Sequence, residues 1–162
     1  MKKRWFLYET AALFAADQIC KAYVEQNMDM GEERKLADHV IIRRVHNKGM
    51  SLGILSDMPK AVRILSASAA GIVTVLQMFA VFRRKQFLRS MSLTMLSSGA
   101  WSNTFDRFIR GYVVDYVGFE GKKKKTTSLT YNLGDFFIFA GTAGTALCTL
   151  FRKRDHHKRT EN

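Results

Sequence analysis

The segment that most constrains this fold runs from residue 64 to residue 82, because its nineteen residues include no charged side chain. At a rise of ~1.5 Å per residue, a helix of this length spans about 28 Å, which is roughly the thickness of the hydrocarbon core of a bilayer. Two further uncharged stretches of sixteen residues, 90–105 and 136–151, are rich in Ser, Thr, Gly and Ala. Such small residues are typical of helices that pack against other membrane helices.

A fourth candidate span, 5–24, is less regular because Glu9, Asp17 and Lys21 interrupt it. Charged residues inside a span are costly and commonly mark function. The alternative for these segments is the buried helix of a soluble bundle, but such a helix carries a polar stripe, and 136–151 offers only Thr, Gly and Cys. We therefore predict an all-α membrane protein with four transmembrane helices, at about 5–24, 61–82, 88–106 and 132–151.

The overall charge points at first to another class of protein. Lys and Arg number 26 against 14 Asp and Glu, the formal charge is +12, and the mean hydropathy of −0.13 is that of a soluble protein. A nucleic-acid binder with this balance gathers its basic residues on one face among aromatic residues. Here the basic residues flank apolar spans, so we expect no nucleic-acid partner.

The placement of the basic residues suggests an orientation in the membrane. Dense basic clusters lie beside the predicted spans at 2–4, 83–89 and 152–159. As many basic residues lie on the opposite side, but in longer loops, so local density favours both termini in the cytoplasm. Residues 25–60 and 107–131 then form outer loops, the run Lys122 to Lys125 faces outward, and 152–162 is a basic cytoplasmic tail.

The first outer loop contains strand-like sequence at 40–45, followed by a glycine-broken continuation at 49–55. These segments predict a small hairpin or β-sheet flap on the outer face. Pro59 suits the first turn of the helix that follows. We expect the first span to remain in the protein, because Asp17 and Lys21 stand where a signal peptide has its small-residue cleavage site.

The sequence offers no metal or disulfide chemistry. Cys20 and Cys148 fall near opposite ends of their predicted spans, too far apart for a disulfide. No His or Cys spacing resembles a zinc site. We therefore expect neither a metal nor another cofactor.

Three acidic residues fall at a similar depth once the spans are drawn. Asp17 lies in the outer half of the first span, Asp106 closes the third and Asp135 opens the fourth. Asn103 precedes Asp106 by three residues and Asn132 precedes Asp135 by three, so each Asn can share a helix face with its Asp. Asp17 and Lys21, four residues apart, predict an ion pair within one helix.

Two carboxylates at one partly desolvated site share a proton and titrate as a coupled pair. One member can then activate water while the other protonates the leaving group. The matched Asn-x-x-Asp units favour this chemistry for Asp106 and Asp135. A structural alternative stays open, in which each Asp caps a helix or pairs with Lys21, Arg107 or Arg110.

The order of motifs resembles that of the lipoprotein signal peptidases, or signal peptidase II, over nearly the whole chain. Residues 17–21 (DQICK) resemble the family's Asp-Gln-x-x-Lys, and Asn47-Lys48-Gly49 resembles its Asn-x-Gly segment. Residues 99–116 (GAWSNTFDRFIRGYVVDY) are similar to the family's most diagnostic stretch. Residues 131–135 (YNLGD) resemble the Phe-Asn-x-Ala-Asp of its last span, with Gly134 in place of Ala and Phe136 where a small residue is common.

The resemblance implies an intramembrane aspartic endopeptidase of the bacterial cytoplasmic membrane, formed by residues 1–162 as one domain. It would cleave diacylglyceryl-modified prolipoproteins before the lipidated cysteine, on the outer side of the membrane, without a cofactor. On this resemblance we predict Asp106 and Asp135 as the catalytic pair. The residues predicted to shape or line the site are Asp17, Lys21, Asn47, Gly49, Gly99, Asn103, Arg107 and Asn132.

A different class of protein also uses charged residues inside a membrane, namely a small four-span ion or proton transporter. It would spread polar residues through the depth of the bundle, whereas the inner halves of the third and fourth spans offer only Ser, Thr and Cys. The sequence therefore favours the peptidase, with lipidated prolipoproteins and membrane lipids as partners. We expect a monomer.

Overall fold

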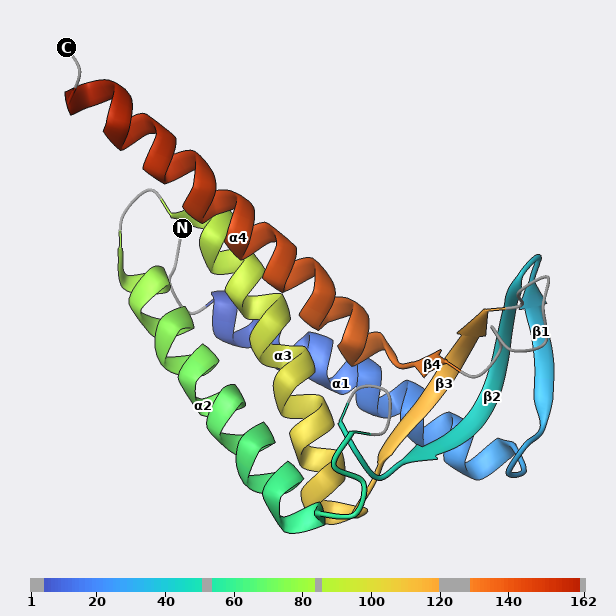
Figure 1. Ribbon diagram of the computed structural model, residues 1–162. Helices are drawn as coiled ribbons and strands as arrows, with labels where there is room; N and C mark the ends of the chain where they lie inside the picture. The colour runs from blue at the N-terminus through green and yellow to red at the C-terminus, as the bar shows by residue number, and fades with distance from the viewer. Residues whose placement is uncertain (1–4, 51–53, 84–85, 120–128, 161–162) are drawn as a thin grey trace.

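In the part of the chain that the structure describes, four helices contain most of the residues, and a small sheet lies beside one end of the helix bundle (Figure 1). The computed structural model describes residues 5–50, 54–83, 86–119 and 129–160, with side chains up to Phe151. The run Lys122 to Lys125 and the side chains of the basic tail lie outside the described residues. The helices are α1 (Trp5–Asn27), α2 (Pro59–Phe82), α3 (Phe87–Ile109) and α4 (Leu133–Thr160).

Helix α3 is the centre of the bundle, packing against α1, α2 and α4. Glycines allow α3 and α4 to approach closely, because a Cβ on Gly99 would overlap the carbonyl oxygen of Gly134. A Cβ on Gly141 would lie 2.5 Å from the backbone of α3 at Ser92 and Leu96. The small residues of the third and fourth segments are therefore required by backbone contact, as in other membrane bundles.

The ends of the helices follow local sequence signals. Pro59 occupies the first turn of α2, where its missing N–H costs nothing. Helix α3 ends at Ile109, and Gly111, just after its capping residue Arg110, has a φ of +84°, in the left-handed region that glycine tolerates. Asn132 and Asp135 form a reciprocal cap at the start of α4, in which the N–H of each donates to the side chain of the other.

The bundle places polar side chains inside and apolar side chains outside. Buried residues of α3 are mostly small and polar, and the charged Asp17 and Lys21 of α1 are fully buried. Apolar side chains of α2 and α4 are exposed, among them Ile64, Ile72, Phe79, Phe139, Leu147 and Leu150. This distribution suits a hydrocarbon surrounding, in which lipid contacts the apolar surface.

Two helices of the described chain are long and apolar enough to cross a membrane, namely α2 and the Leu133–Phe151 part of α4. Helices α1 and α3 match the other two predicted segments in position, but charged and polar residues lower their hydropathy. The expectation of four spans with both termini in the cytoplasm therefore stays a prediction. The helical majority and the small sheet are confirmed.

The sheet is antiparallel with the order β1-β2-β3-β4: β1 is Glu33–Ala37, β2 is Val40–Asn47, β3 is Val113–Phe119 and β4 is Thr130–Tyr131. Strand β2 confirms the predicted strand at 40–45. The predicted continuation at 49–55 is wrong for the described residues, since the N–H of Met50 donates to the carbonyl of Ile54 and Leu55 has a φ of 61°. The inner strand β3 comes instead from the second of the predicted outer loops.

Candidate active site

A cavity of about 360 Å³ opens where α2, α3 and α4 meet the sheet. Its polar lining includes Asn47, Asn103, Arg107, Asp115 and Asp135. Apolar side chains of the three helices line the rest, including Val73, Leu96, Ile138 and Phe139. A largely apolar cavity with a few converging polar groups is the usual form of a ligand or substrate site.

Asp135 is held at the start of α4. Its Oδ2 accepts the N–H of Asn132 at 3.1 Å, and its Oδ1 accepts Nδ2 of Asn103 on α3 at 2.8 Å. The backbone N–H groups at the first turn of a helix favour a negative charge there. The sequence spacing of Asn132 and Asp135 therefore serves a helix cap, and the cap fixes the carboxylate.

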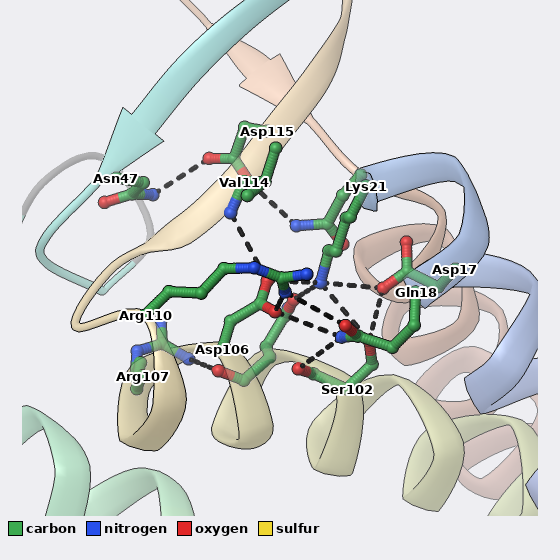
Figure 2. A network of polar contacts seen from close by, with 12 residues as sticks. Asp17, Gln18, Lys21, Asn47, Ser102, Asp106, Arg107, Arg110, Val114 and Asp115 are labelled. Carbon is green, nitrogen blue, oxygen red and sulfur yellow. Dashed lines mark hydrogen bonds and ion pairs between the residues drawn. The ribbon is translucent and has the colours of Figure 1, made fainter. Parts of the chain in front are cut away.

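Asp115 lies in the inner strand β3 and is 3% exposed. Its Oδ1 accepts Nδ2 of Asn132 at 2.7 Å, and its Oδ2 accepts Nδ2 of Asn47 at 3.1 Å. Figure 2 shows Asn47 of β2 reaching Asp115 of β3. Asn132 thus contacts both acidic residues of the cavity, with its side chain on Asp115 and its backbone on Asp135.

The three asparagines are each held in one amide orientation. Oδ1 of Asn47 accepts the N–H of Gly49 at 3.1 Å, and Oδ1 of Asn132 accepts the N–H of Asp135 at 2.9 Å. Oδ1 of Asn103 accepts Nζ of Lys21 at 2.8 Å. Because an ammonium and a backbone N–H can only donate, each amide must present its NH₂ group to a carboxylate.

Burial raises the pKa of Asp115 from its ordinary value to about 7, and the negative charge of Asp135 adds to this effect. The hydrogen bonds from Asn47 and Asn132 act in the opposite direction but are outweighed. A carboxyl group with a pKa near 7 holds its proton in a large share of molecules at neutral pH. Asp115 is therefore suited to donate a proton.

A second polar cluster lies between α1 and α3, and its core of Asp17, Lys21, Ser102 and Asp106 is fully buried (Figure 2). Nζ of Lys21 lies 2.7 Å from Oδ2 of Asp17 and 3.0 Å from Oδ2 of Asp106. Arg110 forms a further ion pair with Asp106. Gln18 and Ser102 complete the cluster, with Ser102 donating to Asp17 at 2.5 Å and Gln18 donating to Asp106 at 3.1 Å. Two cations thus balance two carboxylates.

Asp106, the predicted partner of Asp135, does not line the cavity on which Asp135 lies. Asp106 has no exposed surface, and its Oδ2 also accepts the N–H of Val114 at 3.3 Å. Its oxygens face Lys21, Arg110 and β3, and it is not among the described residues that line the cavity. Its geometry is that of a structural ion pair, which is the alternative left open above.

The other predicted site residues fall into three groups. Asn47, Asn103 and Arg107 line the cavity, and Arg107 also donates to the carbonyl of Gly49 at 3.1 Å. Gly99 lies at the close approach of α3 to α4. The remaining predicted residues, Asp17, Lys21, Gly49 and Asn132, support this lining from behind through the contacts described above.

Asp115 is the residue that the sequence-based assignment missed. It is the last residue but one of the most diagnostic stretch, and the flanking Val113, Val114, Tyr116 and Val117 form a run of β-branched and aromatic residues typical of a strand. Recognising that strand would have placed Asp115 in the sheet beside β2. Among the described residues, no group of three His, Cys, Asp or Glu side chains could hold a metal ion.

Comparison with known proteins gives consistent matches. The family model described as signal peptidase (SPase) II matches residues 10–151. A lipoprotein signal peptidase of Vibrio parahaemolyticus is 32% identical over 159 residues, which cover 96% of this chain and 92% of that protein. One from Shewanella sp. strain MR-4 is 29% identical over 163 residues, covering 98% and 92%.

Two solved structures share the fold. Both are described as a bacterial membrane enzyme structure obtained by the in meso method. The one at 2.3 Å resolution has a TM-score of 0.78 and 19% identity, covering 93% of this chain and 90% of that one. The one at 1.9 Å resolution has a TM-score of 0.73 and 19% identity, with coverage of 90% and 92%.

Proposed function

Because the chain belongs to the signal peptidase II family, we propose that it removes signal peptides from diacylglyceryl-modified prolipoproteins through an aspartic pair formed by Asp115 and Asp135. The family is a protease family, so the chain is a hydrolase. The observation that carries the choice of pair is the polar end of the cavity, where both carboxylates lie and each accepts two hydrogen bonds.

The two carboxylates have environments that suit different steps. Asp135, at the N-terminus of α4, is favoured as the anion and acts as the base that takes a proton from water. The resulting hydroxide attacks the carbonyl carbon of the scissile peptide bond. Asp115, whose pKa is raised to about 7, donates its proton to the leaving nitrogen as the C–N bond breaks. The proton taken by Asp135 then passes to Asp115, directly or through water, which restores the starting protonation of both carboxyl groups.

Asp106 receives a different role in this proposal. Its ion pairs with Lys21 and Arg110 leave it without a free face for water or substrate, so it holds α1 and α3 together. The pairing of Asp106 with Asp135 stays a prediction from sequence, and the geometry supports Asp115 in its place. Both assignments require Asp135.

The apolar part of the cavity supports a lipid-bearing substrate. Val73 of α2, Leu96 of α3 and Phe139 of α4 line it, and the exposed surfaces of these helices are apolar. We propose that the substrate approaches from within a bacterial cytoplasmic membrane, that the site faces the outer side, and that the chain acts as a monomer with lipidated prolipoproteins and membrane lipids as its partners.

The test is cleavage of a diacylglyceryl-modified precursor by purified protein in detergent. Asp115→Asn and Asp135→Asn should each lower kcat by about 10³-fold or more, the scale expected when a general acid or base is lost. Asp106→Asn should reduce thermal stability but retain measurable cleavage per folded molecule. Folded Asp106→Asn without activity, beside an active Asp115→Asn, would instead support the pair assigned from sequence. A wild-type protein that cleaves no lipidated precursor would refute the function itself.

A further inference from the structure

The side chain of Tyr116 connects the buried ion cluster to the start of α4. Tyr116 follows Asp115 in β3, so the two side chains point to opposite faces of the sheet. Tyr116 is 6% exposed and packs in a core cluster with Val24 of α1, with Met28 just after the end of α1, and with Val114. Asp115 faces the cavity on one side of the strand, while Tyr116 faces α1 on the other.

The hydroxyl group of Tyr116 has a partner on each of two helices. It donates to Oδ1 of Asp17 on α1 at 3.2 Å, and it accepts the N–H of Leu133 at 3.1 Å. Leu133 is the first residue of α4, and the first N–H groups of a helix have no partner within it. The hydroxyl oxygen therefore accepts a hydrogen bond from the first N–H of α4, while the hydroxyl proton points to the carboxylate of Asp17. That carboxylate is held in turn by its ion pair with Lys21.

This contact ties together the two segments that carry the acidic residues of the cavity. Asp115 is the neighbour of Tyr116 in β3, and Asp135 lies two residues after Leu133 in α4. Asn132, which precedes Leu133, bonds to both carboxyl groups. One hydroxyl group thus fixes the position of the helix start relative to the strand, next to the residues that carry the two cavity carboxylates.

We propose that Tyr116 is a positioning residue whose hydroxyl group sets the spacing of Asp115 and Asp135 by holding the N-terminus of α4 against Asp17. The proposal rests on the proposed function, since it concerns the same carboxylate pair. Tyr116 is not among the described residues that line the cavity, so it acts through the pair and touches no substrate. Loss of the hydroxyl should therefore slow the chemical step rather than weaken substrate binding, because a small misplacement of catalytic groups lowers the rate strongly.

The experiment compares Tyr116→Phe with wild type and with Tyr112→Phe on a diacylglyceryl-modified precursor. Phe keeps the packed ring and removes only the hydroxyl. Tyr112 is a matched control, because its hydroxyl donates to Glu25, away from α4, at 3.3 Å. We expect Tyr116→Phe to lower kcat per folded molecule about tenfold, on the scale of one hydrogen bond, with KM changed less than about twofold. The control should keep the wild-type kcat.

The pH–rate profile separates positioning from a purely structural role. Its limbs report the titration of the carboxylate pair, so they should move in Tyr116→Phe and stay in place in Tyr112→Phe. A lower thermal midpoint with unchanged kcat per folded molecule and an unchanged profile would overturn the proposal. If wild type cleaves and Tyr116→Phe matches it in every respect, the positioning role fails while the proposed function stands. If the wild-type protein does not cleave the precursor, the result refutes the proposed function instead.

Discussion

Replacing Lys21 by Met should destabilise the bundle more than any single surface change, because Lys21 is a fully buried cation shared by two carboxylates. Its Nζ lies 2.7 Å from Asp17 and 3.0 Å from Asp106, with no exposed surface on any of the three side chains. Nζ also donates to Ser102 and Asn103. Met keeps a flexible apolar chain of similar length, so the change removes the charge and the donors with little loss of packing.

The magnitude follows from what remains after the change. Removing one partner of a buried ion pair costs about 3–5 kcal/mol, because the other charge is left uncompensated. Asp106 retains Arg110 as a partner, whereas the described contacts of Asp17 then consist of the hydroxyls of Ser102 and Tyr116. At about 2–4 °C per kcal/mol for a chain of this size, the thermal midpoint should fall by about 10 °C.

The assay is thermal unfolding of the purified proteins in one detergent at pH 7. The matched control is Lys35→Met, since Lys35 is 60% exposed and pairs with the exposed Asp38, and exposed pairs contribute little. The double variant Lys21→Met/Asp17→Asn should recover more stability than Lys21→Met/Asp106→Asn, because Arg110 already compensates Asp106. A midpoint for Lys21→Met equal to that of the control, or the reverse order of recovery, would refute this reasoning.

Two further predictions concern the carboxylate pair and the packing of α3 against α4. Because the pKa of Asp115 is raised to about 7, the folded protein binds a proton that the unfolded chain releases near pH 4, so the thermal midpoint should fall as pH rises from about 5 to 8. Asp135→Asn removes a charge that raises the pKa of Asp115. In this variant the thermal midpoint should therefore fall less with rising pH, and the fall should end at a lower pH. An unchanged fall would contradict the electrostatic coupling of Asp115 to Asp135. Gly99→Ala should abolish activity and lower the midpoint strongly, because its Cβ would overlap the carbonyl of Gly134, whereas Gly71→Ala, with nothing within 4 Å, should match or exceed wild-type stability. Equal midpoints for these two variants would show that α3 and α4 can separate at no cost.

The helices were accessible to sequence reasoning because each has a local signal. The predicted span 61–82 lies within α2, which begins at Pro59, and the segments 88–106 and 132–151 match α3 and the apolar part of α4. The four-residue spacing of Asp17 and Lys21 predicted their ion pair, and the structure confirms it at 2.7 Å. Helical periodicity brings such partners together without any knowledge of the tertiary fold.

The pairing of Asp115 with Asp135 could not be predicted from the sequence, because it depends on tertiary contacts that no local sequence pattern shows. The Asn-x-x-Asp spacing occurs twice, yet at 132–135 it forms a helix cap, while at 103–106 the Asn faces the cavity and the Asp faces Lys21. Lys21 and Asp106 are 85 positions apart in the chain. Asp115 enters the site through the pairing of β3 with β2, and register between strands from different loops follows from the tertiary fold rather than from spacing.

The fixed orientation of the three asparagines limits where a proton can travel. Asn47, Asn103 and Asn132 direct their NH₂ groups at the carboxylates, and each amide oxygen is turned away onto another donor. These amides therefore stabilise negative charge on Asp115 and Asp135 but offer no acceptor to a proton leaving either group. A proton on the pair can therefore exchange only between the two carboxyl groups, water and whatever occupies the cavity. In the proposed mechanism, this keeps the proton beside the leaving amine.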